Sequence, residues 1–235
     1  MGNLAPARWS LSAAVALTAA LTAGAGRADA ADLPIIGGGS GIVIANTTEC
    51  TLTTIGHDDA GRLVGLTAGH CGEPGQSVLS ETDPNAGVLG RVAASNHDLD
   101  YAVIEFDPDR VAPSDRVGSV SITAVGGPAR FPATVCKKGR TTGTNCGVVW
   151  GDVFASGTET WTQMCVLPGD SGAPVVAGST LVGMVNAYLG VGCVGPEVGT
   201  TMAAIAADLD ATHGVGAGFQ PARGADQGVP AAGGS

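Results

Sequence analysis

The 235-residue chain has few basic side chains and few aromatic ones. It carries 11 Lys and Arg against 21 Asp and Glu, which gives a formal net charge of −10 at pH 7. A nucleic-acid-binding protein needs a basic surface to displace counterions from phosphates, so this balance argues against nucleic acid as a partner. Charged residues make up only 14% of the chain, and 38 residues are glycine. This composition excludes a coiled coil or helical bundle and favours short strands joined by tight turns.

Motifs for binding metals are also absent. None of the four histidines lies in an H-E-x-x-H or His-x-His arrangement, and none of the six cysteines forms a C-x-x-C pair. We therefore expect no metal site and no cofactor.

The first thirty residues have the pattern of a secretory signal peptide. Arg8 lies in a short basic start, an uncharged run follows over 11–23, and Ala28-Asp29-Ala30 supplies small residues around a cleavage position. The apolar run is shorter than the roughly 20 residues that span a bilayer, which favours cleavage after Ala30 over a membrane anchor. We expect a secreted, extracellular protein without stable membrane insertion, whose six cysteines form three disulfides.

Short runs typical of β-strands recur along the rest of the chain, and Gly, Asn, Asp or Pro separates nearly all of them. About a dozen such runs predict an antiparallel barrel or sandwich. Only 202–212 has the pattern of a helix, an Ala-rich run that ends at His213-Gly214. The segment 214–235 is rich in Gly, Ala and Pro, so we expect it to be a disordered tail.

Three short motifs carry residues suited to nucleophilic catalysis. Gly169-Asp170-Ser171-Gly172 permits a sharp turn that exposes the serine hydroxyl and points backbone N–H groups at one place. The run 66–71 ends a strand with His70 beside a cysteine, and Asp98-Leu99-Asp100-Tyr101 puts acids directly before an apolar strand. A serine nucleophile needs a base within hydrogen-bond reach and an acid that fixes the tautomer of the base. Together the motifs supply all three groups.

With His, Asp and Ser in this chain order, the sequence resembles the chymotrypsin-fold serine proteases. It looks most like their secreted bacterial branch, the alpha-lytic protease and streptogrisin type, from about residue 35 to residue 212. The resemblance implies an all-β protein of two six-stranded antiparallel Greek-key barrels, with the active site between them and a short C-terminal helix. The expected boundaries are a signal peptide over 1–30, a protease domain over 31–213, its two barrels over about 35–112 and 113–203, and a tail over 214–235.

The family pattern implies His70 as general base and then acid, Asp100 as orienting acid and Ser171 as nucleophile. Asp98 is the rival acid, but the family places this carboxylate directly before the aromatic residue that starts the strand. The N–H groups of Gly169 and Ser171 would form the oxyanion hole. The expected protein is a monomeric endopeptidase that hydrolyses a peptide or protein substrate through an acyl-enzyme.

The resemblance also implies local disulfides and an ion pair beside the nucleophile. The disulfides would be Cys50–Cys71, Cys136–Cys146 and Cys165–Cys193. Lys137 would pair with Asp170, where an arginine is usual in this branch.

The walls of the specificity pocket follow from the same resemblance, and they are Gln163, Met164, Asn186, Ala187, Tyr188 and Gly199. No Asp or Glu stands at the base of this set, so a basic residue before the scissile bond is not expected. Tyr188 would narrow the pocket, and Met164 would add apolar bulk. We expect a small or medium apolar side chain at this substrate position.

Two alternatives stay open. Asn186 and Tyr188 depart from the family pattern, which is compatible with a binding protein of restricted or no turnover. The presence of His70, Asp100 and Ser171 speaks against complete inactivity. An esterase that uses the same triad is the second alternative.

Overall fold

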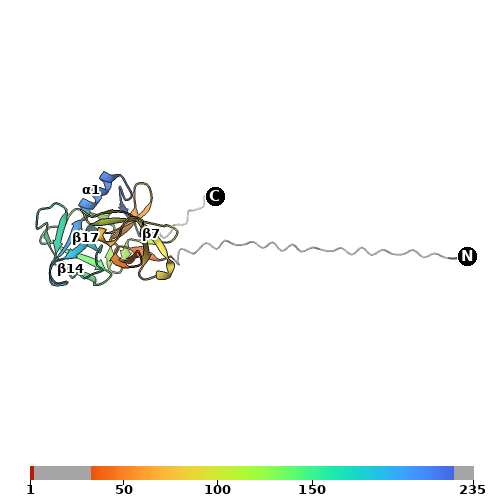
Figure 1. Cartoon of the computed structure of the whole chain (residues 1–235), viewed down its shortest axis with the longest axis horizontal. Helices are drawn as coiled ribbons and strands as arrows, with labels where there is room; N and C mark the ends of the chain where they lie inside the picture. The colour runs from red at the N-terminus through yellow and green to blue at the C-terminus, as the bar shows by residue number, and fades with distance from the viewer. Residues whose placement is uncertain (3–32, 225–235) are drawn as a thin grey trace, which may run out of the picture.

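The computed structural model describes residues 1–2 and 33–224, so the predicted signal peptide, apart from its first two residues, lies outside the described residues. Figure 1 shows a body made mostly of strands, with one α-helix near its surface. The strands form two large sheets, and all strands of the first except β19 (Gln220–Pro221) precede those of the second in the chain.

The first sheet curls around the larger apolar core. Its strands, in sheet order, are β19 (Gln220–Pro221), β4 (Thr54–His57), β5 (Leu63–Ala68), β8 (Tyr101–Phe106), β7 (Val88–Asn96), β6 (Ser77–Ser80), β2 (Gly41–Ile44) and β3 (Thr48–Thr51). All six residues of β5 are buried, because this strand lies in the middle of the sheet between β4 and β8. We call this sheet the first barrel.

The second sheet closes on itself. Its strands, in sheet order, are β12 (Ala124–Val125), β17 (Thr180–Tyr188), β16 (Pro174–Ala177), β13 (Thr134–Gly139), β14 (Gly143–Gly151), β15 (Glu159–Thr162) and β18 (Glu197–Thr201). An additional pairing of β17 with β18 closes the ring, which we call the second barrel. A separate apolar cluster that includes Val149, Met164 and Val185 fills it.

Two short pairs connect the barrels. β1 (Ile35–Gly37) runs parallel to β9 (Ala112–Ser114), and β10 (Arg116–Val117) forms a hairpin with β11 (Val120–Ser121). The predicted all-β, two-barrel class is confirmed. The first barrel has eight strands where six were expected, and one of the additional strands is β19 from the C-terminal segment, which joins the sheet beside β4.

Helix α1 (Met202–Thr212) begins and ends where the sequence predicts. The Thr201 hydroxyl accepts a hydrogen bond from the backbone of Ala204, and His213 ends the helix in the left-handed conformation. Its buried side chains, Ile205 and Leu209 among them, pack into the core of the first barrel. Within 33–224, no helix has both the length and the apolar character that a bilayer crossing requires.

The expectation of a disordered tail from residue 214 is wrong for 214–224. β19 pairs antiparallel with β4, and the backbone N–H of Ala222 donates to the carbonyl of Ile55 at 2.8 Å. β4 offers an unpaired edge, and a Gly- and Pro-rich segment satisfies that edge with backbone groups alone. The remainder of the predicted tail, 225–235, lies outside the described residues.

Three disulfides are present, and they join the pairs that the family resemblance implies. Cys50–Cys71 lies in the first barrel, while Cys136–Cys146 and Cys165–Cys193 lie in the second. Each bond therefore stabilises one barrel and leaves the contact between the barrels to other groups.

Candidate active site

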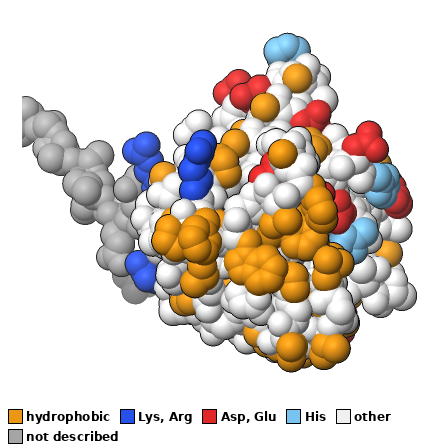
Figure 2. All heavy atoms as spheres, turned by 90° about the vertical axis from the view of Figure 1, so that its left-hand side faces the viewer, with side chains coloured by type: hydrophobic (Ala, Val, Ile, Leu, Met, Phe, Trp, Pro, Cys, Tyr) orange, Lys and Arg blue, Asp and Glu red, His pale blue; other side chains and the backbone are white. Residues whose placement is uncertain are grey.

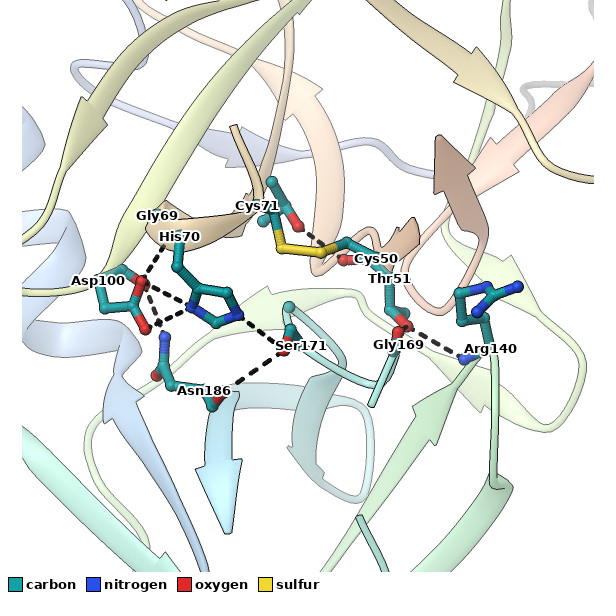
Figure 3. The surroundings of a disulfide bond; sticks show 12 residues. Cys50, Thr51, Gly69, His70, Cys71, Asp100, Arg140, Gly169, Ser171 and Asn186 are labelled. Carbon is teal, nitrogen blue, oxygen red and sulfur yellow. Dashed lines mark hydrogen bonds and ion pairs between the residues drawn. A yellow bond between two sulfur atoms is a disulfide. The ribbon is translucent and has the colours of Figure 1, made fainter. Parts of the chain in front are cut away.

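The three predicted catalytic side chains meet where the two barrels face each other (Figure 3). His70 lies in the 3₁₀ turn η2 (Gly69–Cys71), which follows β5 of the first barrel. Asp100 directly precedes β8, the neighbour of β5 in the sheet, so pairing of the two strands brings acid and histidine together. Ser171 lies in the loop between β15 and β16 of the second barrel.

Hydrogen bonds connect these three side chains in a row. Nδ1 of His70 lies 2.9 Å from Oδ2 of Asp100, and Nε2 of His70 lies 2.8 Å from Oγ of Ser171. The backbone N–H of His70 also donates to Oδ1 of Asp100 at 2.8 Å. Since a carboxylate accepts at Nδ1, the neutral ring carries its proton there and leaves Nε2 free to accept from the serine.

The same contacts set the charge of the pair. The hydrogen bond that the ring donates to Asp100 raises the pKa of His70 above its ordinary value. Burial alone would raise the pKa of Asp100, but hydrogen bonds from the ring and backbone of His70 outweigh it, so this pKa is lowered. Asp100 is therefore ionised wherever His70 can work as a base. Asp98, the rival acid, is exposed to solvent.

Asn186 fixes the backbone of the acid and lines, with Gly199, a cavity beside it. Asp100 has a positive φ of 47°, a conformation that costs energy for a residue with a side chain. Nδ2 of Asn186 donates to the carbonyl of Asp100 at 2.6 Å, and its Oδ1 accepts from the backbone of Thr200 at 2.8 Å. The side chain thus ties the acid of the first barrel to β18 of the second.

An ion pair lies beneath the nucleophile, between the residues predicted for it. Nζ of Lys137 lies 3.0 Å from Oδ2 of Asp170, and both side chains are fully buried. Burial raises the pKa of Asp170, but hydrogen bonds from the hydroxyl and backbone of Thr142 outweigh it, so the pKa is lowered. The charged carboxylate anchors the loop that carries Ser171.

The backbone around Ser171 has the arrangement expected of an oxyanion hole. Within the described part of the chain, the N–H groups of Gly169 and Ser171 donate to no protein acceptor. Gly169 has a φ of 95° and Gly172 a φ of 85°, which glycine adopts without strain. A Cβ at Gly172 would also lie 2.2 Å from the carbonyl oxygen of Thr51.

The six predicted pocket residues have different environments. Met164 is buried in the core of the second barrel, and Tyr188 packs half-buried against the same core. Gln163 is exposed, and its side chain donates to the carbonyl of Val194 at 2.9 Å. Ala187 is exposed on β17, and Gly199 pairs with β15 and β17.

Glu197 is a residue that the sequence analysis missed. It pairs in register with both Thr162 and Tyr188, so its side chain shares their face of the sheet. Oε2 accepts from the hydroxyl of Thr162 at 2.5 Å, whereas Oε1 is buried without a partner among the described residues. Burial raises the pKa of Glu197 to about 8. The sequence contained a signal for this residue. Residues two apart in a strand point to the same side, so an acid two residues before Gly199 lies on the side of that predicted pocket residue.

Apolar side chains gather on the second-barrel side of the molecule (Figure 2). The exposed ones nearest the nucleophile and the pocket in sequence are Leu167, Leu189, Val191 and Val194. Exposed apolar surface of this kind is typical of a place where another chain binds.

Comparison with known proteins finds serine proteases of bacteria that are similar to this chain. No protein-family model matches the chain. Serine protease 2 of Streptomyces fradiae is 30% identical over 165 residues, which are 64% of this chain and 93% of that protein. Protease A of Thermobifida fusca has a similar structure, with a TM-score of 0.64, 24% identity, and coverage of 81% of this chain and 100% of that one.

A further solved structure, an alpha-lytic protease homologue termed N4, is 26% identical with a TM-score of 0.60 and covers 74% of this chain and 97% of its own. The chain therefore belongs to the bacterial branch of the chymotrypsin-fold serine proteases, and it is a serine-type endopeptidase.

Proposed function

We propose that the protein is a secreted endopeptidase that cleaves peptide bonds through an acyl-enzyme on Ser171. The observation that carries the proposal is the 2.8 Å contact between Oγ of Ser171 and Nε2 of His70, with Asp100 bonded to the other ring nitrogen. This is the geometry in which a histidine takes the serine proton as the hydroxyl attacks.

In the first step, Oγ of Ser171 forms a bond to the carbonyl carbon of the substrate, and its proton moves to Nε2 of His70. The charged ring is stabilised by the carboxylate of Asp100, which stays ionised. The negative charge on the substrate oxygen is stabilised by the N–H groups of Gly169 and Ser171, a contribution that typically amounts to about 10²–10³ in rate for one donor.

The tetrahedral intermediate collapses when His70 gives its proton to the leaving amine and the C–N bond breaks. Water then enters, loses a proton to His70 and attacks the acyl-enzyme. The carboxylic acid product leaves, and the proton returns from His70 to Ser171.

The substrate class follows from the apolar surroundings of the site. Met164 belongs to the apolar cluster of the second barrel and Tyr188 packs against it, which supports an apolar side chain at this substrate position. We infer that the residue before the scissile bond is small or medium and apolar. Export is supported by the predicted signal peptide and by the three disulfides, which persist in oxidising surroundings.

The test is labelling with a fluorophosphonate, located by mass spectrometry, alongside hydrolysis of a peptide library. The expected result is one label on Ser171, no label in Ser171→Ala, and peptide cleavage that the substitution abolishes. A folded wild-type protein that takes no label would refute the proposal and favour the binding-protein alternative. Labelling with cleavage of esters but of no peptide in the library would favour the esterase.

A further inference from the structure

The catalytic acid is the last residue of a tight hairpin loop. Strands β7 and β8 pair as far as Asn96 and Tyr101, so residues 97–100 form the whole connection between them. Asp100 ends this loop with a φ of 47°, a conformation that costs energy for a residue with a side chain. The direction of its carboxylate therefore depends on the contacts that hold the loop in this shape.

Asn96 holds the loop from the β7 end. Its Oδ1 accepts hydrogen bonds from the backbone N–H groups of Asp98 and Leu99, both at 3.0 Å. An asparagine side chain that bonds the backbone two residues ahead stabilises a turn. Because the amide oxygen faces the loop, the NH₂ group of the same amide faces the other way.

The NH₂ group of Asn96 points to helix α1. Its Nδ2 donates to Oδ2 of Asp208 at 2.8 Å. A carboxylate only accepts hydrogen bonds, so Asp208 and the two loop N–H groups require the same orientation of the Asn96 amide. The asparagine is thus held between the loop and the helix.

Asp208 also holds the residue that follows the acid. The hydroxyl of Tyr101 donates to the same oxygen, Oδ2, at 2.5 Å, and the tyrosine side chain is buried. Burial and the bond to Asp208 both raise the pKa of Tyr101, so the phenol keeps the proton that makes this bond. One carboxylate oxygen therefore holds both residues that close the hairpin.

The helix fixes the place of this oxygen. Asp208 lies directly before Leu209 and one turn after Ile205, and both of these side chains are buried in the core of the first barrel. Within residues 33–224, the other oxygen of Asp208, Oδ1, accepts no hydrogen bond. All the hydrogen bonds of this carboxylate thus serve the hairpin that carries the acid.

We propose that Asp208 is a positioning residue, which orients the catalytic acid Asp100 by holding both ends of its hairpin from helix α1. This inference rests on the proposed function, because it assigns a role in the catalysis of that site. Asp208 touches neither the substrate nor the reacting atoms, so its removal slows the reaction and leaves substrate binding unchanged.

The test compares Asp208→Ala, which removes the acceptor of both bonds, with Asp208→Asn, which keeps an oxygen that can accept both. We expect kcat of Asp208→Ala to fall about 10-fold to 100-fold, since a misplacement of about 1 Å costs up to about 100-fold. KM should stay within about 2-fold of the wild type. Asp208→Asn should keep kcat within about 2-fold of the wild type, although its charge is gone.

Asp210→Ala is the matched control. It removes the same charge from the same helix, but Asp210 binds the backbone N–H of Gly218 and not the hairpin of the acid. Its kcat should equal that of the wild type. An unchanged kcat in Asp208→Ala would overturn the proposal, and so would an equal loss in Asp208→Asn or in Asp210→Ala.

Tyr101→Phe tests the same role with a smaller change. It removes one of the two bonds to Asp208 and keeps the buried ring, so it preserves the core if Asp208→Ala does not fold. We expect kcat to fall about 3-fold to 10-fold, the equivalent of one hydrogen bond. A kcat equal to that of the wild type would contradict the proposal.

An NMR titration of the His70 ring separates this proposal from the proposed function, because it needs no turnover. In Asp208→Ala the weaker contact with Asp100 should lower the pKa of His70, whereas Asp208→Asn and Asp210→Ala should keep the wild-type value. A His70 pKa that is the same in all of these proteins overturns the role of Asp208 even if the wild type is inactive. A wild type as inactive as Ser171→Ala overturns the proposed function alone.

Discussion

Asp100 accepts hydrogen bonds from both the ring and the backbone of His70. Its negative charge therefore has two effects on the ring, on its pKa and on its tautomer. In Asp100→Asn the ring loses the partner that raises its pKa and fixes its tautomer. We expect kcat to fall by about 10⁴-fold, as for other enzymes of this mechanism. His70 is a base only when neutral, so the residual activity should begin at lower pH than in the wild type. A profile of kcat/KM against pH measures both effects.

Asp98→Asn is the matched control for that substitution. Asp98 lies two residues away and is exposed, so its variant should keep the rate and the pH profile of the wild type. Loss of activity in Asp98→Asn together with an active Asp100→Asn would show that the acid has been assigned to the wrong residue.

Glu197 makes stability depend on pH. Its pKa is raised from 4.5 to about 8 in the folded protein, so the fold binds this proton more tightly than the unfolded chain does. The contribution to stability is therefore complete below about pH 4.5 and is lost as pH rises through about 8. Glu197→Gln removes this loss, and its Tm relative to the wild type should be higher at pH 9 than at pH 5.

Glu105→Gln, on an exposed position of β8, should show the same small difference in Tm at both pH values. A Tm difference for Glu197→Gln that does not change between pH 5 and pH 9 would contradict an uncharged Glu197 in the fold.

The residues of the site differ in how well the sequence predicts them. The serine and histidine stand in short motifs whose local backbone matters for their chemistry, so the sequence around Ser171 and His70 was informative. Strand alternation places Glu197 on the side of Gly199, but no local pattern reveals the partners of Glu197 and Asn186, which lie far away in the sequence. Asn186 was expected to line the pocket, and nothing in the sequence predicted that its side chain also binds the backbone of Asp100.

At the level of elements, the composition of the C-terminal segment does not reveal that β19 pairs with β4. A chain that ends after Gly218 would lose the pairing of β19 with β4 and the bond from Ala222 to Ile55. We expect a loss of at least about 2 kcal/mol in the free energy of unfolding, since each such hydrogen bond contributes about 1 kcal/mol and the core of the first barrel also loses Phe219 and Ala222. Urea denaturation measures it.

A chain that ends after Gly224 is the control for this truncation, because it keeps every described contact of the segment. Its stability should equal that of the full chain. If the two truncated chains unfold at the same urea concentration, β19 does not contribute to stability.

Helix α1 and β19 lie close together in sequence but differ in how far they could be predicted. The helix carries its own signals, a threonine cap and an alanine-rich run. β19 is two residues long and includes a proline, so nothing local favours a strand. It forms because the edge of β4 needs hydrogen-bond partners, which is a property of the finished sheet.

On the scale of the whole molecule, the two ends of the segment 33–224 lie close together. Leu33 and residues 220–223 line one cavity on the first barrel. The turn Gly118-Ser119 is exposed and lies in the β10–β11 hairpin between the barrels. We expect a circularly permuted chain to fold to the same structure. In this chain a linker of about six residues joins residue 224 to residue 33, and the new termini lie between Gly118 and Ser119.

Fluorophosphonate labelling of this rearranged chain at Ser171 measures whether its site assembles, and a folded product that takes no label would contradict the expectation. In such a protein the nucleophile comes first, and the histidine and acid follow it. The family is recognised by the order of His, Asp and Ser along the chain. This order would then depend only on the position of the chain termini. The three groups act through their positions in space, so the fold would be compatible with more than one order of these residues along the chain.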